Sequence, residues 1–96
     1  MGKIQSMKVR IGARANRHLI EIADYIRPRD AQASVRVRER IQETFVMIGE
    51  FPFIGHEGKA RGTRELSIVG LPFIVVYRVH QSAVFILGVH HCAQER

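Results

Sequence analysis

The chain has 96 residues, of which 46% are hydrophobic and 25% are charged. This length and composition indicate one globular domain with a modest core, and they exclude a fibrous, repetitive or largely disordered protein. The net charge of +6 favours an acidic partner, such as nucleic acid, an acidic protein segment or an anionic membrane surface. Solubility alone would also explain the charge. The basic residues are mostly arginine, however, and arginine pairs in bidentate fashion with phosphate or carboxylate.

A single cysteine, Cys92, excludes an intramolecular disulfide framework and a cysteine-rich metal site. No apolar run is long enough to span a bilayer, and the N-terminus lacks the apolar core of a signal peptide. The sequence therefore predicts a cytoplasmic protein without a membrane partner.

Residues 7–94 are expected to form one domain, preceded by a loosely ordered lead at residues 1–6, with Met7 as a second candidate for the native start. Residues 7–11 alternate between apolar and basic side chains, which is the period of a half-exposed strand. Lys8 and Arg10 suit the edge of a sheet, because charged side chains discourage edge-to-edge aggregation.

Residues 13–26 predict a first helix, which Pro28 ends because its ring clashes with the preceding turn. Asp30 is a suitable N-cap for a second helix running to about Ile48, with Gly49 expected in a left-handed C-cap. The short link makes an αα-hairpin. The predicted apolar stripes are Ala15, Leu19, Ile22, Ala23 and Ile26 on the first helix, and Ala33, Val37, Ile41, Thr44, Phe45 and Ile48 on the second.

Residues 51–62 contain three glycines and a proline and predict a loop, which Phe51 and Phe53 are expected to anchor beneath the helices. This loop is either a flexible connector or a basic flap beside the sheet, since loops on rigid scaffolds often carry function.

Residues 64–69, 73–79 and 83–89 predict three strands, and their short connections join antiparallel neighbours. The middle strand is nearly all apolar and is expected to be buried on both faces. The order strand, two helices, loop and three-stranded antiparallel meander predicts an α+β fold with the helices packed on one face of the sheet.

The strands GTRELSIVGLPFIVVYRV and AVFILGVHH resemble the RelE/ParE superfamily of toxins from type II toxin–antitoxin systems. In the helical half, LIEIADYI and FVMIGEFPFIG are similar to the first helix of this superfamily and to its second helix with the following loop. The resemblance covers almost all of residues 7–94, and it is closest to the ParE branch.

The resemblance implies one of two mechanisms. ParE-like toxins poison DNA gyrase by binding it and need no catalytic residues, cofactor or metal. RelE-like toxins cut messenger RNA in the ribosomal A site, which requires a proton acceptor, a proton donor and cations on the phosphorane. RelE-type nucleases often place an arginine three residues before the tyrosine of the penultimate strand. Here that tyrosine is Tyr77 and the residue three before it is Ile74, which favours the gyrase poison.

Under the nuclease alternative, the catalytic candidates are His90, His91, Arg64, Lys59 and Arg61, with the two histidines as acid or base because they titrate near neutrality. Under the ParE interpretation no catalytic residue is expected, and the binding candidates are Arg61, Arg64, Arg78, His90 and His91.

Structural roles are open for two of these arginines. For Arg64 three roles are open: pairing with an acidic residue, contact with the antitoxin, or holding the loop. Arg78 should lie on the face opposite Tyr77, where a buried arginine needs a partner such as Glu65. His18 on the first helix is interpreted as a surface or boundary residue.

The family also implies a cognate ParD-like antitoxin whose acidic, apolar-rich segment folds onto the toxin. We expect it to cover the two helices and a sheet edge, in a hetero-oligomer. Gyrase is the expected target, and the ribosome with its mRNA is the target in the alternative. A third interpretation is an inactivated family member kept as an interaction module.

Overall fold

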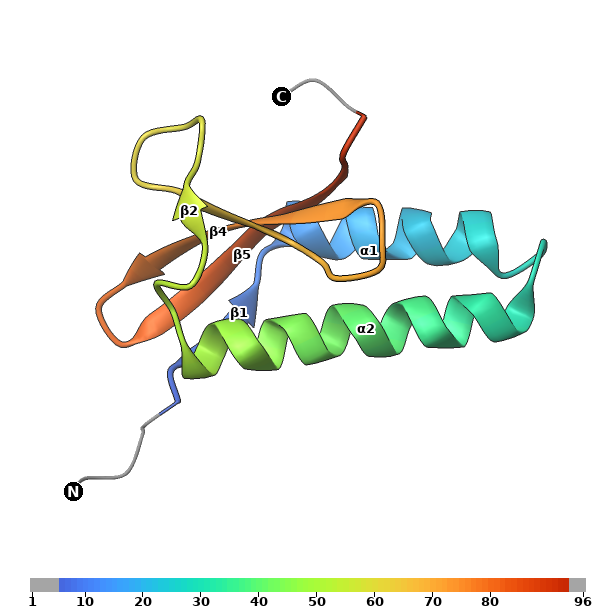
Figure 1. Cartoon of the computed structure of the whole chain (residues 1–96), viewed down its shortest axis with the longest axis horizontal. Helices are drawn as coiled ribbons and strands as arrows, with labels where there is room; N and C mark the ends of the chain where they lie inside the picture. Colours follow the sequence, from blue (N-terminus) through green and yellow to red (C-terminus); the bar gives the residue numbers. More distant parts are fainter. Residues whose placement is uncertain (1–5, 94–96) are drawn as a thin grey trace.

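The computed structural model describes residues 6–93. Residues 1–5 of the predicted lead and residue 94 at the predicted domain end lie outside the described residues. The elements in chain order are β1 (Lys8–Ile11), α1 (Ala13–Ile26), α2 (Ala31–Glu50), β2 (His56–Glu57), β3 (Arg64–Ser67), β4 (Phe73–His80) and β5 (Ala83–His91). The α+β class and the predicted order of these elements are confirmed (Figure 1).

The sheet is mixed, with strand order β1-β5-β4-β3-β2. Its last three strands form the predicted antiparallel meander. The first strand occupies the predicted edge but runs parallel to β5, with Lys8 opposite Ala83. Strand β2 lies in the segment for which the sequence predicts a loop, and it pairs with β3 at the other edge of the sheet. A parallel pairing needs a long crossover connection, and residues 12–82, which join β1 to β5, supply it.

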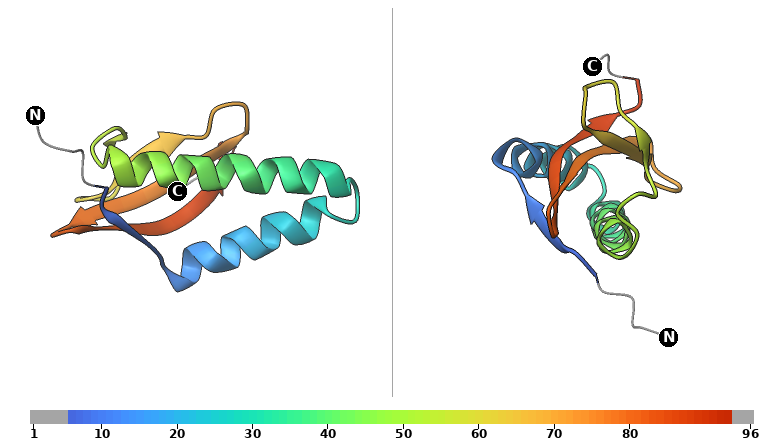
Figure 2. Two further views of the ribbon diagram at one scale, coloured as in Figure 1. Left: turned by 90° about the horizontal axis from the view of Figure 1, so that it is seen from below. Right: turned by 90° about the vertical axis from the view of Figure 1, so that its left-hand side faces the viewer.

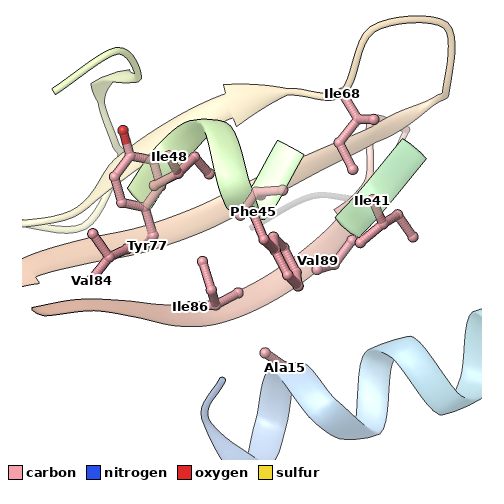
Figure 3. Close-up of a cluster of buried hydrophobic side chains, with 10 residues drawn as sticks. Ala15, Ile41, Phe45, Ile48, Ile68, Tyr77, Val84, Ile86 and Val89 are labelled. Atoms are coloured by element: carbon pink, nitrogen blue, oxygen red, sulfur yellow. The ribbon is translucent and has the colours of Figure 1, made fainter. Parts of the chain in front are cut away.

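The two helices diverge from their link to form a V, and the strands lie within its open end (Figure 2). Helix α2 contacts β1 and β5, and α1 packs along β5. In Figures 2 and 3, β5 passes between the helices, with Ala15 of α1 on one side of the strand and Phe45 of α2 on the other. Both helices therefore depend on β5 for their position.

The core lies between α2 and the sheet (Figure 3). The amphipathic spacing of α2 turns Ile41, Phe45 and Ile48 toward the strands, where Val75 and Tyr77 are fully buried. The other face of β4 is only half-buried. The prediction that β4 is buried on both faces is therefore correct only for the face toward α2. The full cluster comprises Ala15, Ile41, Phe45, Ile48, Ile68, Val75, Tyr77, Val84, Ile86 and Val89.

A register shift interrupts the pairing of β4 with β5. Tyr77 lies opposite Ile86 and Val76 opposite Gly88, so Leu87 is an extra residue on β5. Such a bulge reverses which residues face each side of the strand. Because of it, Val89 joins the core, and the following histidine, His90, points to the opposite face.

The helix boundaries are largely as predicted. Helix α1 ends before Pro28, and the Asp30 carboxylate accepts a hydrogen bond from the Ala33 amide at 3.0 Å. The C-cap prediction for Gly49 was wrong, because α2 continues to Glu50. Gly49 instead allows β1 to approach: an added Cβ would lie 2.9 Å from Val9 Cγ2, and the Gly49 carbonyl accepts from Met7 N.

The prediction that Phe51 and Phe53 anchor the loop after α2 was wrong, because these side chains are 50% and 64% exposed. The buried Tyr77 anchors it instead. Its hydroxyl donates to the Pro52 carbonyl at 2.8 Å and accepts from Gly55 N at 2.9 Å. Burial raises the pKa of Tyr77 above its ordinary value, so the hydroxyl stays protonated and able to donate.

Replacement of Tyr77 by phenylalanine should therefore destabilise the protein by about 1–3 kcal/mol, because the buried Gly55 N–H loses its acceptor. Urea unfolding followed by circular dichroism measures this. The matched control is Tyr25→Phe on the exposed surface of α1, which should change the free energy of unfolding by less than about 0.5 kcal/mol. Equal effects of the two substitutions would contradict the assigned role of the Tyr77 hydroxyl.

Candidate functional site

The first candidate site is a groove of about 690 Å³ between α1 and α2, closed at one end by β1, which we name the interhelical groove. Four large apolar side chains remain open to solvent in it: Ile11 is 46% exposed, Ile20 52%, Val35 45% and Val46 56%. An apolar surface of this kind, rimmed by polar residues, is typical of a protein–protein interface. The groove walls also include Val9, Leu19, Ile22, Ala23, Ile26, Val37, Ile41 and Phe45.

The electrostatics of the groove are dominated by arginine. Arg27 and Arg38 line the groove, and among the described residues Asp24 is the one acidic residue in its lining. The helical hairpin as a whole, residues 13–50, holds seven basic and six acidic side chains, a net charge of +1, and all seven of its arginines are exposed. The two arginines at the groove itself therefore favour an apolar partner with acidic side chains beside its apolar face.

The second candidate site is a cleft of about 1430 Å³ between α1 and the sheet, which we name the histidine cleft. It brings together three of the sequence-predicted residues, Lys59, His90 and His91. Helix α1 adds Arg14 and His18, and the buried Glu65 lies in its wall. These are groups that can bind an anion or transfer a proton.

Two imidazoles meet within this cleft. The rings of His18 and His90 lie 4.9 Å apart between centroids, at 58°, and Nδ1 of His18 accepts from the Val89 amide at 3.1 Å. Burial is the main cause that lowers the pKa of His18, with Arg14 next and Arg17 adding to it, while Glu21 opposes the shift. The folded protein therefore favours the neutral form of His18.

The predicted arginines do not gather in the histidine cleft. Arg64 holds the loop: its Nη1 donates to the Gly55 carbonyl at 2.6 Å, and its guanidinium lies 4.9 Å from the Phe53 ring centroid. Arg64 faces the Tyr77 side of the sheet, because it pairs with Tyr77 in the β3–β4 ladder.

The prediction that Arg78 is buried and paired with Glu65 was wrong. Arg78 is exposed, and its Nη2 lies 3.4 Å from the carbonyl of Arg61, which is itself exposed. Glu65 accepts from the Lys59 backbone amide at 3.1 Å. In residues 6–93 the ion pair that the structure records joins Arg40 to Glu43. Arg78 lies at the end of β4 that is open to solvent, so water solvates its charge and no buried acidic partner is needed.

Sequence reasoning missed His18 and the exposed groove residues. The signal for the groove was present in the helices, because Ile20, Val35 and Val46 are large apolar residues outside the predicted stripes. For His18 no local pattern was available, since its contact with Val89 spans 71 residues.

Within residues 6–93, no group of three His, Cys, Asp or Glu side chains is placed to hold a metal ion. In the same part of the chain, no helix combines the length and apolar character needed to cross a membrane.

Comparisons with known proteins agree with this architecture. The family described as "ParE toxin of type II toxin-antitoxin system, parDE" matches residues 9–96. The protein named "Putative toxin Y4kP" of Sinorhizobium fredii is 38% identical over 88 residues, which cover 92% of this chain and 91% of that protein.

Two solved structures share the fold. The chromosomal ParDE system from P. aeruginosa matches with a TM-score of 0.82 at 19% identity, covering 91% of this chain and 97% of that one. The RelBE2 toxin–antitoxin complex from Mycobacterium tuberculosis matches with a TM-score of 0.66 at 20% identity, covering 98% and 100%. With the family match across nearly the whole chain, the conclusion is that this chain belongs to the ParE toxin family of type II toxin–antitoxin systems.

Proposed function

We propose that this toxin inhibits bacterial growth by binding and poisoning DNA gyrase in the cytoplasm. The observation that carries the proposal is the position of Arg64. Arg64, a catalytic candidate under the nuclease alternative, binds loop carbonyls on the Tyr77 side of the sheet, whereas His90 lies on the opposite face against His18 of α1. A nuclease that used Arg64 with His90 would need both around one phosphate, and these two residues lie on opposite faces of the sheet. A toxin that acts by binding needs no such set.

We further propose that a ParD-like antitoxin neutralises the toxin by filling the interhelical groove. The groove offers an apolar floor with exposed Ile20, Val35 and Val46 and arginines at its margin. An amphipathic antitoxin helix with acidic flanks matches both properties, because its apolar face fills the groove while its carboxylates meet arginine. The neighbours of this fold in the ParDE and RelBE2 systems are themselves toxin–antitoxin assemblies, which supports a hetero-oligomer here.

A ribosome-dependent mRNA endonuclease is the second candidate function. The histidine cleft favours the nuclease, because it is lined by Lys59, His90 and His91 together with His18 and Arg14 of α1. This set contains two cations, Lys59 and Arg14, and three imidazoles, but it lacks the predicted Arg64 and Arg61. A nuclease of this chain would therefore use a rearranged site.

The experiment that separates these functions adds purified toxin, free of antitoxin, to a gyrase supercoiling assay and to an in vitro translation reaction. We expect loss of supercoiling or trapped cleaved DNA, with translation intact. His90→Ala and His91→Ala should retain this activity. Translation arrest with mRNA cleavage that these substitutions abolish would instead establish the nuclease, and inactivity in both assays would favour the interaction module.

The groove assignment predicts that Val35→Glu weakens binding of the antitoxin encoded beside the toxin by about tenfold or more, or ~1.4 kcal/mol. A carboxylate there would be buried against the apolar face of the partner and would repel its acidic flanks. Isothermal titration calorimetry measures the change in Kd.

The matched control is Val69→Glu, which makes the same change at an exposed position outside the groove lining. It should leave the Kd within about twofold. Equal loss of affinity in both variants, or no loss in Val35→Glu, would rule out the groove as the antitoxin site.

A further inference from the structure

Helix α1 is joined to β5 by a hydrogen bond that depends on one unprotonated nitrogen. The Val89 amide donates to Nδ1 of His18, so that nitrogen must carry a lone pair and the ring proton must be on Nε2. Val89 is 4% exposed and belongs to the core cluster. Its amide would be costly to leave unpaired.

The sequence makes room for this contact at Gly88. A Cβ on Gly88 would lie 2.7 Å from Nε2 of His90 and 3.3 Å from both Nδ1 and Cε1 of His18. The two imidazoles therefore close over the glycine from α1 and from β5, and no larger residue would fit between them. The bulge at Leu87 places His90 on this face.

The charges around His18 oppose a second proton on its ring. On α1, Arg14 and Arg17 disfavour the imidazolium and Glu21 favours it. On β5, His90 faces the ring directly, and His91 lines the same cleft. A proton on His18 would add a cation beside Arg14 and Arg17, against the ring of His90.

We propose that this seam between α1 and β5 is a proton-operated latch, closed when Nδ1 of His18 accepts from Val89 and opened when that nitrogen is protonated. Protonation turns the acceptor into a donor that points at another donor. The proton comes from solvent and no covalent bond changes. Because α1 is also one wall of the interhelical groove, opening of the latch changes the shape of that surface.

The direction of the response follows from the pKa of His18. It is lowered by folding, so the latch contributes its full stabilisation above the ordinary histidine pKa of about 6.5. That stabilisation is lost as the pH falls from there through the lower folded-state value. This behaviour belongs to the free toxin and holds whether or not gyrase is its target.

The test is hydrogen exchange of the Val89 amide in the free protein, measured by NMR from pH 8 to pH 5 and corrected for intrinsic exchange. In the wild type the protection should fall by up to about tenfold per pH unit below about pH 6.5. His18→Asn supplies an amide oxygen as an acceptor that does not titrate, so its protection should not vary with pH. His80→Asn, at an exposed position on the β4–β5 hairpin, is the matched control and should behave as the wild type.

A second measurement needs no variant. The ¹⁵N shift of Nδ1 of His18 should titrate together with the loss of protection at Val89. The latch is overturned if Val89 is equally protected at pH 8 and pH 5, if His18→Asn keeps the wild-type pH dependence, or if Nδ1 protonates while the Val89 amide remains protected.

Discussion

The extra residue in β5 is the constraint on which the rest of the structure depends. If Leu87 were paired as a regular strand residue, strict alternation from Val84 and Ile86 would turn Gly88 and then His90 toward α2. The bulge instead puts Val89 into the core and leaves Gly88 and His90 facing α1. A single strand can then satisfy an apolar partner on one side and a polar partner on the other. Helix α1 and the histidine cleft both take their positions from this change.

The two faces produced in this way differ in chemistry. Toward α2 the strands present aliphatic side chains and Tyr77, whose hydroxyl fixes the loop that follows the helix. Toward α1 they present the imidazole of His90 and the buried carboxylate of Glu65, in a cleft open to solvent. The apolar groove adjoins this cleft, since Ile22, Ile26 and Val37 line both, and it extends toward β1. The domain thus carries, side by side, a surface suited to a protein helix and one suited to charged groups.

Local patterns predicted the elements but not their long-range contacts. The bounds of α1, the Asp30 cap and the meander follow from apolar spacing, proline and capping chemistry, which act over a few residues. The parallel pairing of β1, the role of Gly49 and the hydrogen bond of His18 each join segments far apart in the chain. Phe51 and Phe53 were misplaced for a related reason, because hydrophobicity alone cannot show that a tyrosine elsewhere already holds their loop.

The candidate site was predicted in part. His90, His91 and Lys59 were candidates because of their residue types and their positions in the family pattern, and the fold brings them into one cleft. It misassigned Arg78, because burial of a strand residue depends on whether a neighbour covers that end of the sheet. The groove could have been found from the helices themselves, where large apolar residues stand outside the stripe that the core uses.

The parallel pairing of β1 with β5 also orders events during synthesis. The first strand leaves the ribosome long before its partner, since Lys8 must wait for Ala83 and Ile11 for Ile86. Until the C-terminal strand emerges, the helices have no sheet on which to pack, and their apolar sides remain uncovered. The toxin therefore cannot complete its fold until β5 has been translated, and an antitoxin already present would meet the helices of the nascent chain before the finished domain exists.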